Sequence, residues 1–267
     1  MHKKGFVVVP IAKMSKYAED LSETSDEVLH GTEVYIMEET QNGYVKIQTE
    51  YNYSGFVPVW AVCMGSYADE GRCIITNMFA DVLSEPKVQA VIQESLPMGS
   101  FIKVVSNDAD NNYAYVALAD GRKGFARKNF IANIQTKVDN EVELRDAIAN
   151  TALKYKGAQY RWGGKTHLGI DCSGLCFMSY FINGITIFRD SNLQDPVKQI
   201  DKANIQKADL IYFKGHIGMY LNDGNMIHSS DSQNGVEISP IDWENVIKIG
   251  SVWSNKLTFS GSSCIFR

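Results

Sequence analysis

Residues 170–181 read IDCSGLCFMSYF and decide the fold around them, since an acidic residue and a thiol stand at the start of an apolar run. An apolar run of this length predicts a core helix. Asp171 or Ser173 can accept hydrogen bonds from the free backbone N–H groups at the start of that helix. Cys172 then lies within the first turn, where the helix dipole is expected to stabilise a thiolate and lower the thiol pKa.

Two interpretations of Cys172 compete. It is either a small apolar residue in a core helix, as free cysteines often are, or a nucleophile that the helix presents. Gly174 favours the nucleophile, because a side chain at that position is expected to crowd whatever approaches the sulfur. Cys176, one turn further along among apolar neighbours, is interpreted as packing.

A helical pattern begins at residue 139 and precedes the quoted stretch. Asp139 or Asn140 can cap this first helix, and Gly157 ends it. Its core face is formed by Leu144, Ile148, Ala152 and Tyr155, and that of the second helix by Leu175, Met178 and Ile182. Strands and hairpins follow from residue 208. Helices first and strands after predict an α+β domain over residues 138–267.

The first half of the chain repeats a pattern of short alternating strands broken by turn residues. Three segments recur: 31–36 with 99–104, 44–47 with 115–118, and 55–62 with 124–131, and Gly31 and Gly99 are 68 residues apart while Gly55 and Gly124 are 69 apart. Chance similarity among β-rich segments is the alternative. The period favours two small all-β barrels, residues 1–65 and 66–137, so the fold class is multidomain.

Composition limits the classes of function. The chain has 267 residues with 45% hydrophobic and 21% charged side chains, and lacks the run of about 20 apolar residues that spans a bilayer. Its N-terminal lysines and apolar residues resemble a signal peptide but are predicted to form a first strand. A net charge of -5 argues against nucleic acid as a partner. Five cysteines without a disulfide spacing favour a reducing compartment, the cytoplasm.

A hairpin over residues 214–230, KGHIGMYLNDGNMIHSS, carries two of the five histidines. The loop is predicted as three residues, a type I turn with glycine at its left-handed position. That loop pairs Leu221 with Asn225, which brings His216 and His228 onto one face of the hairpin. Such diagonal neighbours lie about 7 to 8 Å apart at Cβ, within reach for two imidazole rings.

A cysteine nucleophile needs a base, and the base needs an orienting group. Cys172, His216 and His228 are therefore the predicted catalytic residues. A zinc site is the other chemistry open to one cysteine and two histidines. No CxxC or HxxxH spacing accompanies these three residues, so neither a metal nor another cofactor is predicted.

At these residues the third domain resembles the NlpC family, also called p-sixty-like, the papain-like cysteine peptidases of bacterial cell-wall peptides. The resemblance rests on YRWGG at 160–164, DCSGL at 171–175, RDS at 189–191 with Gln194, ADLIYF at 208–213, HIGMYL at 216–221 and IHSS at 227–230. The paired β-units more weakly resemble bacterial Src-homology-three (SH3) domains. Together the domains are similar to the γ-D-glutamyl-L-diamino-acid endopeptidases of that family.

The resemblance implies a role for each matching residue near the nucleophile. Cys172 is implied to be the nucleophile, His216 the base and His228 the third, orienting member. Tyr160 is implied to lie near the oxyanion, although an aromatic that packs the WGG loop is the alternative.

Substrate binding is implied to involve Asp171, which is expected to bind a free α-amine or else only caps the helix. Ser173 and Ser191 are expected to line the same pocket. The first β-domain is implied to supply an aromatic residue, for which Tyr53 is chosen over the neighbouring Tyr51. It is also implied to supply an acidic residue, and both Glu27 and Glu50 fit.

The implied reaction is hydrolysis of the γ-D-glutamyl–diamino-acid bond in small murein peptides with a free N-terminal L-Ala, for cell-wall peptide recycling in the cytoplasm. A secreted hydrolase of intact wall, with the β-domains as wall-binding modules, is one alternative. A binding protein with an inactive catalytic domain and an acyltransferase are two others. The choice between diaminopimelate and lysine, and the oligomeric state, are left open.

Overall fold

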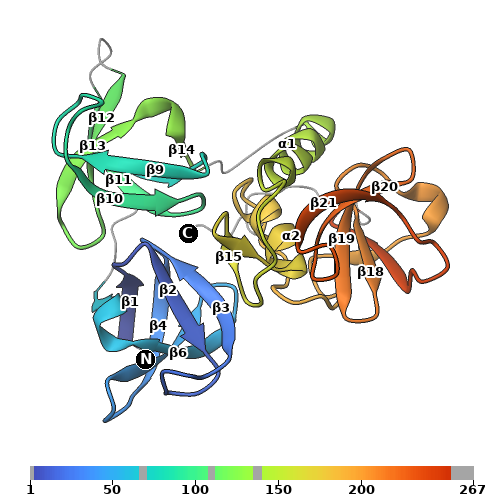
Figure 1. Cartoon of the computed structure of the whole chain (residues 1–267), viewed down its shortest axis with the longest axis horizontal. Helices are drawn as coiled ribbons and strands as arrows, with labels where there is room; N and C mark the ends of the chain where they lie inside the picture. Colours follow the sequence, from blue (N-terminus) through green and yellow to red (C-terminus); the bar gives the residue numbers. More distant parts are fainter. Residues whose placement is uncertain (1–2, 66–70, 108–111, 135–139, 254–267) are drawn as a thin grey trace. The chain divides into compact units, whose positions relative to one another are not determined.

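The computed structural model describes residues 3–65, 71–107, 112–134 and 140–253. The chain divides into two compact units, residues 1–134 and 135–267. Strands predominate in both, and the two α-helices of the described residues belong to the second unit (Figure 1). No helix in this part of the chain combines the length and the apolar character that a bilayer crossing requires.

The first unit begins with a seven-stranded antiparallel sheet. Its strands are β1 (Lys3–Val7), β2 (Ile11–Ser15), β3 (Thr24–Leu29), β4 (Glu33–Glu39), β5 (Tyr44–Thr49), β6 (Ser54–Pro58) and β7 (Val62–Met64). They lie in the order β3-β2-β6-β5-β4-β1-β7. Alternate residues point to one side and build an apolar core that includes Met14, Val45, Ile47 and Val57.

A second sheet repeats the first. Its strands are β8 (Arg72–Ile75), β9 (Phe79–Leu83), β10 (Ile92–Pro97), β11 (Phe101–Ser106), β12 (Tyr113–Ala117), β13 (Lys123–Arg127) and β14 (Ile131–Asn133). The order β10-β9-β13-β12-β11-β8-β14 is the order of the first sheet with every strand number raised by seven. The predicted internal repeat is therefore confirmed.

The repeated segment 55–62 is not one continuous strand. β6 ends at Pro58, and a 3-10 turn, Val59–Ala61, precedes β7. Pro58 has no N–H to donate to a neighbouring strand, but it does not cause the interruption, because β13 ends in the same way at Arg127. The turn allows β7 to pair with β1. The second copy contains the same interruption, Lys128–Phe130, between β13 and β14.

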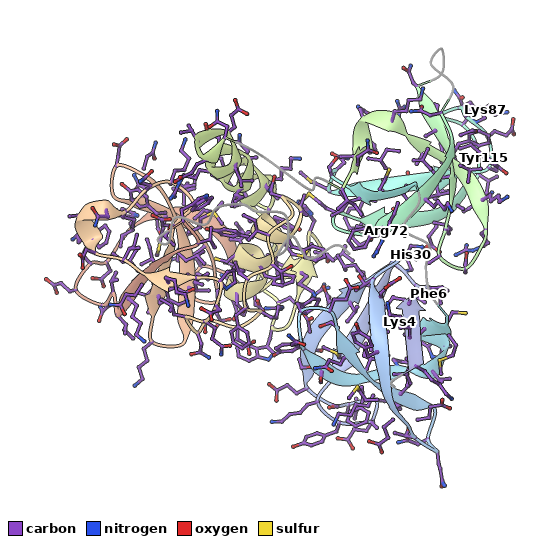
Figure 2. All side chains as sticks on the ribbon, turned by 180° about the vertical axis from the view of Figure 1, so that it is seen from behind. Lys4, Phe6, His30, Arg72, Lys87 and Tyr115 are labelled. Carbon is purple, nitrogen blue, oxygen red and sulfur yellow. The ribbon has the colours of Figure 1, made fainter. Side chains whose placement is uncertain are left out.

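His30 joins the two sheets of the first unit (Figure 2). Its buried ring accepts the backbone N–H of Ala119 at Nε2, over 3.0 Å, so the ring proton is on Nδ1 and is donated to the carbonyl of Val8 at 3.1 Å. Burial lowers the pKa of His30 to about 4. Arg72 adds a contact by donating to the carbonyl of Gly31 at 3.0 Å.

Helix α1 (Glu141–Lys154) opens the described part of the second unit. Asn140 caps it by accepting the backbone N–H groups of Val142 and Glu143, whereas Asp139 lies outside the described residues. The predicted core face is confirmed, because Leu144, Ile148, Ala152 and Tyr155 are all buried. Gly157, in the left-handed region with φ 86°, follows the end of the helix as predicted.

Helix α2 (Cys172–Phe181) lies in the centre of this unit. All ten of its residues are buried, so the predicted stripe of Leu175, Met178 and Ile182 is too narrow; Ile182 is a half-buried cap. The reason is that α1 packs on one side of α2 while β19 (His216–Asn222) and β20 (Asn225–Ser230) pack on another (Figure 1).

The sheet of the second unit has six antiparallel strands. Besides β19 and β20 they are β17 (Lys198–Gln199), β18 (Leu210–Phe213), β21 (Gly235–Pro240) and β22 (Lys248–Ser251). The order is β17-β22-β18-β19-β20-β21, and a small separate pair is formed by β15 (Lys165–Thr166) and β16 (Gly169–Ile170). Helices first and sheet after is the α+β arrangement that the sequence predicts.

Candidate active site

Cys172 is the first residue of α2 and Asp171 is its N-cap. The Asp171 carboxylate accepts the backbone N–H of Gly174 at 2.5 Å, so Asp171 caps the helix and Ser173 does not. The cysteine is buried, with 7% of its surface exposed. Backbone hydrogen bonds from Ser173 and Ile217 reach the sulfur. Because Ile217 follows His216 in β19, the sulfur lies beside the strand that carries the predicted base.

The pKa of the Cys172 thiol is raised above its ordinary value. Burial is the main cause, and the adjacent Asp171 carboxylate adds to it, while the hydrogen bonds from Ile217 and Ser173 act in the opposite direction. The predicted lowering of this pKa is wrong, because loss of hydration outweighs the favourable N–H groups. At neutral pH the sulfur therefore keeps its proton until a base removes it.

His216 and His228 form a hydrogen-bonded pair. Nε2 of His216 lies 2.8 Å from Nδ1 of His228, and the rings meet edge to face with their centroids 5.0 Å apart. The predicted placement of both rings on one face of the hairpin is confirmed. His216 thus has its Nε2 occupied by another histidine, which leaves Nδ1 as the nitrogen for proton exchange with a nucleophile.

The turn of this hairpin differs from the prediction. Its loop consists of Asp223 and Gly224, which both have positive φ (47° and 75°), as in a type I′ turn. The extra residue forms a bulge at Leu221, which does not pair with Asn225. Beyond the bulge the strands keep the predicted register, so the positions of the two histidines do not change.

Gly218 allows the two strands to approach closely beside the histidines. A Cβ at this position would lie 2.8 Å from Sδ of Met226 and 3.4 Å from Cβ of His228. Any larger residue therefore requires Sδ of Met226 to move and contacts Cβ of His228 at an ordinary van der Waals distance.

Both rings of the pair are neutral at pH 7. Burial lowers the pKa of His216 to about 4, with a smaller effect from His228. Burial also lowers the pKa of His228, and Glu237 partly offsets that effect. A neutral imidazole has one N–H, so one nitrogen of the facing pair donates and the other accepts. When Nε2 of His216 donates, its Nδ1 has a free lone pair and can accept the thiol proton.

Ser229 fixes the histidine hairpin to the nucleophile. Its hydroxyl donates a hydrogen bond of 2.7 Å to the backbone carbonyl of Ile170. Ser229 follows His228, and Ile170 precedes the Asp171 cap of α2. The predicted base and the predicted nucleophile are therefore held together by a buried contact as well as by the packing of α2 on β19 and β20.

Arg189 and Asp171 form a buried ion pair at the start of α2. The guanidinium donates to Oδ1 and Oδ2 of Asp171 at 3.0 and 3.1 Å, and also to the Ser173 hydroxyl at 2.8 Å. Ser173 donates to Oδ1 at 3.2 Å, and the backbone N–H of Gly163 donates to Oδ2 at 2.8 Å. With the capped N–H of Gly174, five donors surround a carboxylate that offers about four lone-pair sites.

Gly174 has a structural explanation. A Cβ there would lie 2.3 Å from the carbonyl oxygen of Gly164 and 2.9 Å from Oδ1 of Asp171. The interpretation that this glycine leaves room for a substrate at the sulfur is wrong, because backbone of the WGG loop already occupies that space.

Tyr160 is half-buried, and its pKa is raised to about 12, mainly by burial and next by Cys172 and Asp171. The phenol therefore keeps its proton and lies within electrostatic reach of the sulfur. Ser191 is half-buried in the loop after Arg189, and Tyr53 is half-buried against the core of the first sheet. The substrate contacts of Tyr160, Ser191, Tyr53 and Asp171 stay predictions.

Sequence reasoning assigned no role to Arg189, Glu237 or Ser239. Arg189 belongs to the RDS motif at 189–191, and this motif is the signal from which its role could be predicted. Ser239 Oγ lies 2.8 Å from Nε2 of His228, and Oε1 of Glu237 lies 3.7 Å from the same nitrogen. Both belong to β21, where Glu237 pairs directly with His228. Only the register of β20 with β21, across the loop 231–234, reveals them.

The zinc alternative has no support among the described residues, in which no group of three or more His, Cys, Asp or Glu side chains is placed to hold a metal ion. Nε2 of His216 and Nδ1 of His228, which face each other, form a hydrogen bond with each other. The arrangement suits nucleophilic attack with acid–base assistance.

A cysteine at the start of a buried helix, beside a hydrogen-bonded histidine pair on an antiparallel sheet, is the arrangement of a cysteine hydrolase. Residues 157–249 match the NlpC/P60 family. Over 88% of its length the chain is 37% identical to Dipeptidyl-peptidase 6 from Lysinibacillus sphaericus, of which 91% is covered. The chain belongs to the NlpC/P60 family and is a cysteine peptidase.

Two further similarities extend beyond the catalytic domain. Over 83% of its length the chain is 30% identical to Gamma-D-glutamyl-L-lysine dipeptidyl-peptidase from Bacillus cereus, of which 72% is covered. The crystal structure of an NlpC/P60 family protein from Bacillus cereus has the same fold, with a TM-score of 0.79 at 24% identity over 92% of this chain and 98% of that one.

Proposed function

We propose that the protein hydrolyses the γ-D-glutamyl–diamino-acid bond of small murein peptides that begin with a free L-Ala, in the cytoplasm, as a step of cell-wall peptide recycling. The observation that carries this proposal is the placement of Cys172 beside the His216–His228 pair. The name of the Bacillus cereus relative supports the γ-D-glutamyl substrate class. The reaction needs no cofactor, because sulfur and imidazole supply the nucleophile and the proton carrier.

In the first step the sulfur attacks the γ-glutamyl carbonyl while Nδ1 of His216 takes the thiol proton. The resting pair is neutral, because the Cys172 pKa is raised and the His216 pKa is about 4. Proton transfer therefore accompanies attack and does not precede it. The imidazolium that forms keeps its Nε2–H on Nδ1 of His228, which orients it.

The second half of the reaction returns the proton. His216 protonates the departing amine of the diamino acid, and water then hydrolyses the thioester with the same imidazole as base. The oxyanion that forms in both halves is stabilised by the backbone N–H of Cys172 at the start of α2 and by the Tyr160 hydroxyl. Tyr160 can donate at any physiological pH, because its pKa is raised to about 12.

Asp171 is the proposed partner of the substrate α-amine. Since five donors already surround its carboxylate, the amine must replace one of them. The Ser173 hydroxyl, at 3.2 Å the longest of the five contacts, is the donor that an ammonium group displaces most easily. Ser191 lines the same pocket in this proposal.

The two sheets of the first unit are proposed to be SH3-type domains, with Tyr53 and either Glu27 or Glu50 as substrate contacts. Their identical strand order supports a common domain type. Alanine at Tyr53 is expected to raise KM with little change in kcat, because this side chain contributes to binding alone.

Hydrolysis of two tripeptides tests the proposal. L-Ala-γ-D-Glu-diaminopimelate and L-Ala-γ-D-Glu-L-Lys are each incubated, free and N-acetylated, with the wild type and with Cys172→Ala. We expect release of the diamino acid from the free-amine peptides by the wild type alone. Equal turnover of free and acetylated peptides would overturn the role of Asp171. Cleavage by Cys172→Ala would overturn the nucleophile, and an intact peptide would overturn the substrate class.

A further inference from the structure

The His216–His228 pair is chemically ambiguous without a third partner. Two neutral imidazoles joined through Nε2 and Nδ1 exist in two forms. In the productive form Nε2 of His216 donates, and its Nδ1 can accept the Cys172 proton. In the reverse form Nδ1 of His228 donates, which puts the His216 proton on Nδ1, the nitrogen left for the sulfur. The reverse form has no base for Cys172.

The group beside Nε2 of His228, the ring nitrogen that does not face His216, decides between these forms. In the productive form His228 Nε2 carries a proton and must donate it, whereas in the reverse form the same nitrogen must accept. Ser239 Oγ lies 2.8 Å from it, and a hydroxyl can do either. Glu237 Oε1 lies 3.7 Å from it, and an ionised carboxylate can only accept.

We propose that Glu237 and Ser239 of β21 are positioning residues that hold His228, and through it His216, in the Nε2–H form that the reaction requires. Ser239 supplies the hydrogen bond that fixes the ring plane. Glu237, whose negative charge favours a proton on the nearer nitrogen, removes the ambiguity of the hydroxyl. The inference rests on the proposed roles of Cys172 and His216.

The groups around the ring are consistent with this assignment. Two titratable neighbours act on His228. His216 of β19 is hydrogen-bonded to it, and Glu237 of β21 raises its pKa. Helix α2, which packs on β20, has no carboxylate or basic side chain in Cys172–Phe181, and its titratable side chains are Cys172, Cys176 and Tyr180. A negative charge at Glu237 therefore has no opposing charge on these elements near the same nitrogen.

The register of the sheet explains why β21 supplies both groups. Glu237 pairs directly with His228, and Ser239 lies two residues further along on the same face of β21. Ile238 between them points to the opposite face and is 40% exposed. β21 thus carries the hydrogen-bond acceptor Ser239 and the charge of Glu237 on one face, because residues two apart in a β-strand point to the same side.

The direct test is nitrogen-15 NMR of the histidine rings in the full-length protein at pH 7. The wild type is expected to show His216 and His228 as Nε2–H forms. Glu237→Gln removes the charge and adds an amide donor, so the reverse form is expected to become populated. Glu244→Gln, which removes one exposed carboxylate after β21, is the matched control and should leave both rings unchanged. A wild-type His216 with its proton on Nδ1 would overturn the proposal.

Kinetics on the free-amine tripeptide separate positioning from general damage. Both Glu237→Gln and Ser239→Ala are expected to lower kcat about tenfold or more with little change in KM, which is the size of effect expected when a group that supports a functional histidine is lost. Ser239→Thr should recover most of kcat. In Glu237→Gln the acid limb of the pH profile should move to lower pH, because Glu237 raises the pKa of His228.

The outcomes also separate this inference from the proposed function. Unchanged tautomers and kcat in Glu237→Gln, with an inactive Cys172→Ala, would overturn the positioning role alone. An active Cys172→Ala would overturn the proposed nucleophile, whatever the histidine tautomers are.

Discussion

His30 in the first unit and His216 in the second are both buried histidines whose pKa is lowered to about 4, in each case mainly by burial. Their hydrogen-bond partners differ. His30 bonds backbone at both ring nitrogens, through the carbonyl of Val8 and the N–H of Ala119. His216 is hydrogen-bonded at Nε2 to a second side chain, and the sulfur of Cys172 lies beside Ile217, the next residue of the same strand.

The difference shows that a shifted pKa does not identify a catalytic histidine. At His30 both nitrogens are committed to rigid groups, so protonation breaks a structural contact between two sheets. At His216 one nitrogen is hydrogen-bonded to a side chain that can follow a change of charge, which suits the proposed role of a base that gains and loses a proton in each cycle. The partners therefore separate a structural histidine from a catalytic one.

The two histidines are expected to differ most when each ring is replaced by an amide. His216→Gln is expected to lower kcat by about 10² to 10⁴, the contribution of a general base, with little effect on thermal stability. His30→Gln is expected to leave kcat within about twofold and to lower the melting temperature, as loss of a buried hydrogen-bonded group does. Steady-state kinetics and thermal unfolding of the full-length variants provide both readouts. A His216→Gln enzyme with near wild-type kcat would contradict the assignment.

The pH dependence of stability gives the next largest effect. The folded pKa of His30 is below its ordinary value of 6.5, so the unfolded chain binds the proton more tightly. The contribution to stability is complete above pH 6.5 and is lost as the pH falls toward 4, up to about 3 kcal/mol. Hydrogen exchange of the Ala119 amide, corrected for its intrinsic rate, measures this loss. His30→Gln should remove the pH dependence, and the same slope in both proteins would refute it.

Gly218→Ala tests the spacing of the two strands beside the His216–His228 pair. The new methyl group displaces Sδ of Met226, which belongs to a flexible side chain, and makes an ordinary van der Waals contact with Cβ of His228. Overpacking of this kind costs about 1 kcal/mol, the low end of the usual range, so we expect kcat to fall by less than about tenfold. The double variant Gly218→Ala with Met226→Ala should recover part of the loss, and Met226→Ala alone is the control. No change in the single variant would show that the strand spacing is not critical.

Local signals in the sequence predicted much of this molecule. Asn140 at the start of α1 and the alternation of His216 and His228 in a hairpin depend on neighbours along the chain, so propensity and register are sufficient. The repeat of strand patterns predicted two copies of one sheet. Even the wrong turn type did no harm, because the bulge at Leu221 restores the register.

The failures around Cys172 concern contacts between distant segments. The pKa of Cys172 follows from burial, which depends on β19 and α1 packing around α2. The fork of Arg189 on Asp171 joins residues 18 positions apart and cannot be found from periodicity. The position of Gly174 cannot be interpreted from the sequence alone, because the loop at Gly164, which fills the space beside it, is brought there only by folding.

In the proposed mechanism Cys172 and His216 rest as a neutral pair and exchange a proton during attack. The pH dependence of Cys172 alkylation by iodoacetamide tests it most directly, because only the thiolate reacts. Mass spectrometry of the Cys172 peptide separates its signal from that of exposed Cys63. We predict a rate that rises about tenfold per pH unit from pH 6 to 8, as expected below a raised thiol pKa. A rate that stays constant over this range would show a resting thiolate–imidazolium pair and contradict the account.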